Sequence, residues 1–204
     1  PEFAKGRFRE RPGALISVGG ARTEHWTSLG MCNLYTATFS AQIKIVDMMN
    51  VTRVAHTGAA AMRDDYLERA RNLGQNVANA MLTGNFSYSK NAPQGLCPSC
   101  HLNDISWKPG EQSVECLVCG IKGNIVIKDG KVSVEWLPDV DAQNRLTVEG
   151  KITHLTEIED EKKYYYGPIQ DEALSRLEKF KAYKSCILKS PTKEARKAER
   201  RQKQ

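Results

Sequence analysis

The chain has 204 residues, of which 40% are hydrophobic and 26% are charged, a composition that suits one or two folded domains with an apolar core. It contains no apolar stretch long enough to cross a membrane and nothing that resembles a secretory signal, so we expect a cytoplasmic protein without a membrane partner. The net charge is +6, but seven Lys or Arg against two Glu fall in residues 187–204, so the rest of the chain is nearly neutral. This distribution argues against a nucleic-acid surface on the folded part. It favours a solvated basic tail, with a tail that binds polyanions as the alternative.

The N-terminal region predicts a strand followed by a helix. Residues 12–21 form a short apolar run that ends in a glycine pair, which is typical of a buried parallel strand opening into a loop. Thr23 or Thr27 can cap a helix that ends before residue 43. We expect this helix to turn four apolar side chains inward, namely Trp26, Leu29, Leu34 and Tyr35.

A second strand and a second helix are expected to follow. The strand is predicted over residues 43–54, and Gly58 then breaks the chain. Two carboxylates favour a helix N-terminus at residues 64–65, and Gly84 stands where the helix would stop. The apolar positions recur at helical spacing: Leu67, Ala70, Leu73, Val77, Ala78 and Met81. The order strand, helix, strand, helix is that of an open α/β sheet, in which ligands bind at the carboxyl ends of the strands.

Four cysteines make the most specific chemical pattern in the chain. Cys97, Cys100, Cys116 and Cys119 follow the spacing Cys-x2-Cys-x15-Cys-x2-Cys. Each pair can form a tight turn that points two thiolates at one ion, so we expect one tetrahedral metal site. Two disulfides or ordinary buried thiols are the alternatives, but disulfides need an oxidising compartment. Zinc is the preferred metal, and iron stays open because both metals accept four sulfurs.

The remaining elements are predicted from turns and periodicity. His101 is treated as a bystander beside the metal site, and Cys32 as a buried inert thiol. A β-hairpin with a two-residue turn is expected over residues 124–136, and a further strand over residues 145–155. Residues 168–186 predict an amphipathic helix that packs against the body.

One region resembles a known family. The residues Ser17-Val-Gly-Gly-Ala-Arg22, then Glu24-His-Trp26, Gly58-Ala59 and a helix containing Ala70-Arg-Asn-Leu-Gly74, look like the C-terminal half of a flavodoxin-like NAD(P)H-dependent FMN reductase. The resemblance implies a doubly wound parallel sheet that binds FMN and uses NAD(P)H. Carried over position by position, it implies that Gly19, Gly20, Ala21 and Arg22 lie beside the flavin ring. We also expect a homo-oligomer.

The sequence departs from this family in one important respect. The family's phosphate-binding loop, which follows its first strand, has no counterpart in these 204 residues. The chain begins with Pro1 and its first strand starts almost at once, so we expect part of the protein to lie upstream. Catalytic side chains stay unassigned, because the four histidines form no recognisable constellation and flavin chemistry needs none.

These expectations divide the chain into four parts. Residues 1–85 are the C-terminal half of a flavodoxin-like FMN domain, 86–96 a linker, 97–157 a zinc-ribbon-like β domain, and 158–204 a C-terminal helix and basic tail. The predicted function is NAD(P)H-dependent hydride transfer to FMN and onward to an unknown acceptor. The alternative is a non-enzymatic metal-ribbon module that binds a protein or a nucleic acid. A third possibility joins the two, with four thiolates holding iron and passing electrons to the flavin.

Overall fold

The computed structural model describes residues 9–137, 144–166 and 169–182. The chain divides into two compact units, of which the first runs to Glu157 and the second begins at Ile158. The predicted basic tail, residues 187–204, and Cys186 lie outside the described residues. No helix in the described part combines the length and the apolar character that a membrane crossing requires.

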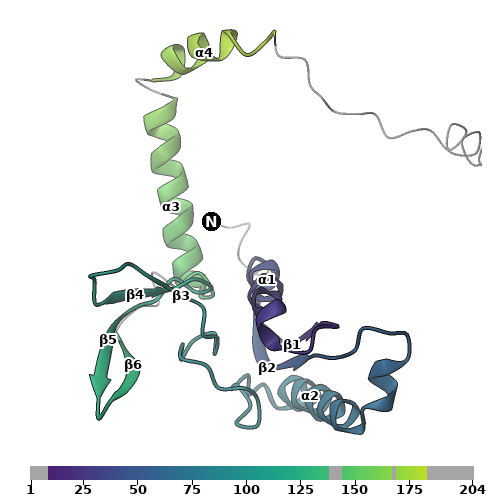
Figure 1. Ribbon diagram of the computed structural model, residues 1–204. Helices are drawn as coiled ribbons and strands as arrows, with labels where there is room; N and C mark the ends of the chain where they lie inside the picture. The colour runs from purple at the N-terminus through teal and green to yellow at the C-terminus, as the bar shows by residue number, and fades with distance from the viewer. Residues whose placement is uncertain (1–8, 138–143, 167–168, 183–204) are drawn as a thin grey trace, which may run out of the picture. The chain divides into compact units, whose positions relative to one another are not determined.

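The first unit begins with a pair of parallel strands, as predicted. Strand β1 (Arg11–Val18) pairs with β2 (Ile43–Val51), and helix α1 (Ser28–Phe39) connects them (Figure 1). Strand β2 ends three residues before the predicted limit of residue 54. The register of the pair shifts by one residue between Gly13 and Ala14, which is a bulge in β2 opposite these residues.

Helix α1 forms where expected, but three of its four predicted inward side chains do not point inward. Trp26, which precedes the helix, is 78% exposed, Leu29 is 61% exposed, and Leu34 is also exposed. The buried residues are Tyr35, as predicted, and Met31, which lies one helical turn before it. Apolar residues occur on several sides of this helix, so the sequence could not show which side the rest of the fold would cover.

Helix α2 (Asp64–Thr83) confirms the predicted start and stop. Asp64 and Asp65 lie in the first turn, and Gly84 ends the helix in the left-handed conformation with φ of 71°. Leu73 is buried against Met49 and Val51 of β2. Leu67 and Met81 are exposed, so the apolar stripe is covered only along part of its length.

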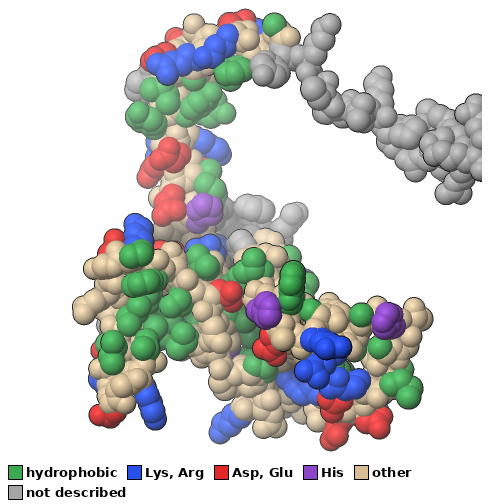
Figure 2. Space-filling view, in the orientation of Figure 1, with side chains coloured by type: hydrophobic (Ala, Val, Ile, Leu, Met, Phe, Trp, Pro, Cys, Tyr) green, Lys and Arg blue, Asp and Glu red, His purple; other side chains and the backbone are tan. Residues whose placement is uncertain are grey.

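A four-stranded antiparallel sheet follows. Its strands lie in the order β3 (Ile105–Trp107), β4 (Ser113–Cys116), β5 (Lys122–Lys128) and β6 (Lys131–Trp136). The predicted hairpin is β5–β6, with Asp129 and Gly130 both at positive φ in its two-residue turn. Strands β3 and β4 were not predicted. Figure 2 shows hydrophobic side chains over the β5–β6 hairpin, in agreement with the exposure of Ile127 and Val132.

The predicted strand over residues 145–155 is wrong, because helix α3 (Val148–Tyr165) begins there. Thr147 caps this helix, since its Oγ1 accepts a hydrogen bond from the Gly150 amide at 3.0 Å. Glu149 lies in the first turn, where its charge favours the helix dipole. The β-branched residues suggested a strand, but this cap and the polar residues that follow it favour the helix.

The C-terminal helix is shorter than predicted. Helix α4 (Gln170–Glu178) occupies part of the predicted range 168–186, and none of its residues is buried. We expected the apolar face of this helix to be buried by packing, but Leu174 and Leu177 are exposed.

The core of the first unit joins the two sheets. One apolar cluster contains Leu15, Met31, Tyr35, Ile45 and Met48 together with the four predicted metal ligands. The stretch over residues 86–96, predicted as a linker, packs against this body: the Ser89 amide donates to the Val46 carbonyl at 2.8 Å, and Ala92 is buried. The mixed α/β class is confirmed, while the flavodoxin-like arrangement and the four-part division stay predictions.

Candidate functional site

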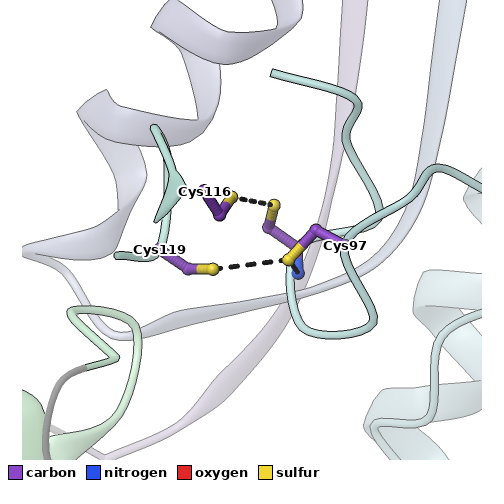
Figure 3. Close-up of side chains that lie close together, drawn as sticks. Cys97, Cys116 and Cys119 are labelled. Carbon is purple, nitrogen blue, oxygen red and sulfur yellow. Dashed lines mark hydrogen bonds between the residues drawn. The ribbon is translucent and has the colours of Figure 1, made fainter. Parts of the chain in front are cut away.

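The four cysteines converge on one point. Their Sγ atoms all lie within 4.8 Å of one another, and we call Cys97, Cys100, Cys116 and Cys119 the four-cysteine cluster. The sulfur pairs Cys97–Cys119 and Cys100–Cys116 are each 3.4 Å apart, which is far longer than a disulfide bond (Figure 3). The alternative of two disulfides is thus not what the structure contains.

Two similar turns position these sulfurs. In the first turn the His101 amide donates to the Cys97 carbonyl, and in the second the Gly120 amide donates to the Cys116 carbonyl, both at 2.9 Å. The residue after each pair takes a left-handed conformation, with φ of 60° at His101 and 82° at Gly120. Each turn therefore points both of its thiols toward the other turn.

The geometry of the four-cysteine cluster fits a tetrahedral metal ion. With metal–sulfur bonds of about 2.3 Å, a tetrahedron places its sulfurs about 3.8 Å apart, which is close to the two separations of 3.4 Å and within the 4.8 Å that encloses all four sulfurs. All four cysteines are 0% exposed, as in closed structural sites that leave no open position for a substrate. The His101 ring stacks on Tyr88 with centroids 3.7 Å apart.

The thiols affect one another's protonation. Hydrogen bonding from Cys100 lowers the pKa of Cys116, and the same contact raises the pKa of Cys100. Hydrogen bonding from Cys100 also lowers the pKa of Cys97. A lowered thiol pKa favours the thiolate, which is the form that binds metals.

The glycine loop after β1 lies at the carboxyl end of the parallel strands. The Gly19 amide is already used, because it donates to the Val51 carbonyl at 2.8 Å. Within the part of the chain that the structure describes, the amides of Gly20, Ala21 and Arg22 donate to no other backbone group. A Cβ added to Gly20 would lie 2.9 Å from the Cα of Ala55, so glycine is required here by the neighbouring loop.

Gly20 and Arg22 of this loop border an open hollow. It has a volume of about 540 Å³, is lined by Gly20, Arg22, Arg53, Ala55 and His56, and is called here the carboxyl-end hollow. Its lining contains two arginines and no carboxylate. An anion or an electron-rich ring edge is the kind of group that such a lining favours.

Arg53 was missed by the sequence analysis. Its backbone is left-handed, with φ of 63°, which costs free energy for a residue other than glycine. Its amide donates to the Ala21 carbonyl at 2.9 Å, and its Nε donates to the Arg22 carbonyl at 3.2 Å. Arg53 therefore ties the end of β2 to the predicted cofactor loop. No sequence signal identified it, because the pairing of the two loops depends on the strand register.

The lining of the carboxyl-end hollow offers donors that suit one edge of a flavin ring. Unused amides and arginines are suitable partners for the ring, whose reduced form is anionic. Among the described residues we find no cradle of amides and hydroxyls for the phosphate, in agreement with the missing loop noted in the sequence. The structure thus brings Gly20 and Arg22 to one hollow, whereas Ala21 is not in its lining and the Gly19 amide is used in a backbone hydrogen bond to Val51.

Comparison with known proteins gives one relative by sequence and one similar solved structure. The chain is 31% identical over 157 residues to a protein named flavone synthase cfoJ from Aspergillus candidus, and the match covers 74% of this chain. A solved structure named flavone reductase is similar with a TM-score of 0.73 at 20% identity over 90% of the chain, which shows a shared α/β fold. The chain spans 47% of the curated relative's length and 61% of that solved structure. No protein-family model matches the chain.

Proposed function

We propose that the intact protein is an NAD(P)H-dependent flavin oxidoreductase whose acceptor is a flavone-type aromatic ketone. The curated relative is named for forming a flavone and the similar solved structure for reducing one, and these names supply the acceptor class. When bound, FMN would take a hydride from NAD(P)H and transfer it to the acceptor. Residues 1–85 would supply one side of the flavin site.

The observation that carries this proposal is the carboxyl-end hollow. Parallel strands bind their ligands beyond their carboxyl ends, and this is where Gly20, Arg22 and Arg53 lie. The three unused amides and two guanidinium groups would stabilise negative charge on a reduced ring. The chain's own residues bind and orient the cofactor in this proposal.

The four-cysteine cluster supports a structural metal, for which we propose zinc. Its ligands lie inside the core of the first unit, in contact with residues of the parallel strands. A metal-ribbon module that captures a protein or nucleic acid would present its ribbon separately from such a core. The burial of the cluster therefore favours the oxidoreductase over the non-enzymatic alternative.

An absorption spectrum of the intact purified protein tests both proposals. Bound FMN absorbs near 450 nm, a ferric tetrathiolate absorbs across the visible range, and zinc is colourless. NADPH oxidation is then followed with added FMN, with unsubstituted flavone as acceptor. A colourless protein that takes up no FMN and shows no flavone-dependent turnover would refute the oxidoreductase.

Replacing Arg22 tests the flavin loop. We expect Arg22→Gln to weaken FMN binding about tenfold, since it removes one charge-assisted interaction worth about 1.5 kcal/mol. Titration of the intact protein by flavin fluorescence quenching measures the affinity. Gly20→Val is a poorer test, because its side chain would collide with the Ala55 backbone whether or not a flavin binds.

The matched control is Arg71→Gln, which removes a charge from the exposed surface of α2. It should leave FMN affinity within about twofold of the unmodified protein. Equal FMN affinity in the Arg22→Gln variant and in the unmodified protein would remove this loop from the site.

A further inference from the structure

The outer edge of β6 is free to pair with another strand. β6 is the last strand of the four-stranded sheet, and among the described residues no strand pairs with its outer side. Its register with β5 is continuous over the whole of β6, so no bulge interrupts this edge, and the strand contains no proline. Edge strands are usually protected against pairing by bulges, prolines or charges. Only the charged side chains of β6 therefore decide whether it accepts a partner strand.

The direction of the β6 backbone groups follows from the hairpin. In an antiparallel pair, residues that bond to the neighbouring strand alternate with residues that point their N–H and C=O groups away from it. The Leu137 amide, just after β6, donates to the Lys122 carbonyl of β5 at 2.9 Å. The odd-numbered residues of β6 therefore bond to β5, and the even-numbered residues Val132, Val134 and Trp136 direct their backbone groups to the open edge.

The side chains along this edge are exposed, and their pattern is symmetric in shape. Val132 is 68% exposed, and Ile127, which lies opposite it on β5, is 72% exposed. On the other face of the strand, Lys131 and Glu135 are also exposed. They stand two positions before and two positions after Ser133 and carry opposite charges. A half-turn about Ser133 therefore brings each charge opposite its counter-charge.

One antiparallel register with a second copy uses all of these features. With the two-fold axis at Ser133, Val132 lies opposite Val134 of the second copy. This pair has the outward backbone groups that hydrogen bonding requires. In the same register, Lys131 lies opposite Glu135 of the second copy, and opposite charges placed in this way stabilise a sheet.

The neighbouring registers lose this charge match. With the axis one residue earlier, Glu135 would lie opposite Asp129 of the second copy, and like charges directly opposite each other destabilise a sheet. With the axis one residue later, Lys131 would lie opposite Leu137 and would have no counter-charge. Charge complementarity thus selects the axis at Ser133.

We propose that a second copy of this chain pairs with the outer edge of β6 in this register, so that the two hairpins form one continuous sheet. By symmetry the contact between Lys131 and Glu135 occurs twice, and each valine pair exchanges two backbone hydrogen bonds. Glu135 also forms an exposed ion pair with Lys128 at 2.6 Å, so its carboxylate lies between two lysines in the dimer. The pairing goes beyond the proposed function, because it needs neither flavin nor nicotinamide.

Sedimentation velocity of the full chain tests the pairing. We expect the dimer fraction to rise between about 5 and about 300 µM, a range suited to the small interface that two strand edges make. Lys131→Glu and Glu135→Lys each place like charges opposite one another twice, so each should weaken the dimer about tenfold or more. An equimolar mixture of the two variants should restore the dimer, because every contact then joins a glutamate to a lysine.

Lys108→Glu is the matched control. It makes the same charge change on an exposed residue just after β3 and should leave the dimer within about twofold of the unmodified chain. Hydrogen exchange at the Val132 and Val134 amides should slow as the concentration rises, and this measurement needs no variant. Circular dichroism checks that each variant is folded.

Four results would overturn the proposal. They are a chain that stays monomeric over the whole range, a dimer that neither charge reversal weakens, a mixture of the two variants that stays monomeric, and exchange at the two valine amides that does not change with concentration. None of these results bears on FMN binding, so the flavin proposal and this one fail separately.

Discussion

Replacing Cys100 with serine is expected to release the metal and to destabilise the whole first unit. A structural zinc site contributes apparent binding free energies of about 10–16 kcal/mol to folding, and a missing thiolate removes much of this contribution. The effect should reach beyond the cysteine turns, because the cluster packs against Leu15, Met31, Tyr35 and Ile45 of the parallel sheet and its helix.

The start of α3 should respond to the same change. The Arg145 amide donates to the Cys119 carbonyl at 2.9 Å, and Asn144 Nδ2 donates to Ser99 Oγ at 2.7 Å. Both contacts lie on the cysteine turns, so their loss should expose the first turn of α3. Metal analysis, urea unfolding and hydrogen exchange at residues 144–150 measure these three consequences.

Cys32→Ser is the matched control for this experiment. Cys32 packs against the same cluster but is not one of the four convergent sulfurs. We expect this variant to keep its metal and to lose at most about 1 kcal/mol of stability. If Cys100→Ser retained one metal per chain and unfolded like the unmodified protein, the four-sulfur site would be refuted.

The second large effect is expected at Asp47. This residue lies in the middle of β2 with its side chain 0% exposed, and it accepts hydrogen bonds from Arg69 and from Asn76 Nδ2 on α2. Asn76 also donates to Ser89 Oγ at 3.1 Å, so the network reaches the segment 86–96. Asp47→Asn leaves the arginine without its counter-charge, and we expect a loss of about 2–4 kcal/mol in the free energy of unfolding.

The exposed pair Arg63–Asp65 provides the control. Its nitrogen and oxygen atoms are 2.7 Å apart, but both side chains reach solvent, so Asp65→Asn should lower the free energy of unfolding far less than Asp47→Asn does. Urea unfolding of both variants gives the comparison, and a cycle with Arg69→Met isolates the energy of the buried pair. Equal losses for Asp47→Asn and Asp65→Asn would show that burial adds nothing here.

Local signals in the sequence correctly predicted several elements. Gly84 ends α2, Asp129 and Gly130 make the hairpin turn, and the two cysteine pairs fold into the expected turns. Each of these features depends on residues a few positions apart along the chain. The cysteine spacing also predicted that two turns far apart in the chain contact each other. Two Cys-x2-Cys pairs at this spacing are typical of one shared metal site.

The sequence determined by itself the parallel strand pair, the position of α2, the hairpin and the convergence of four cysteines. Tertiary structure alone decided which side of α1 is buried, that Asp47 pairs with Arg69 and that Arg53 joins the glycine loop. Turns and helix ends are governed by the conformations of single residues and by neighbours within one or two turns. Burial and side-chain pairing depend on which surfaces meet after the chain has folded, and a local pattern does not contain that information.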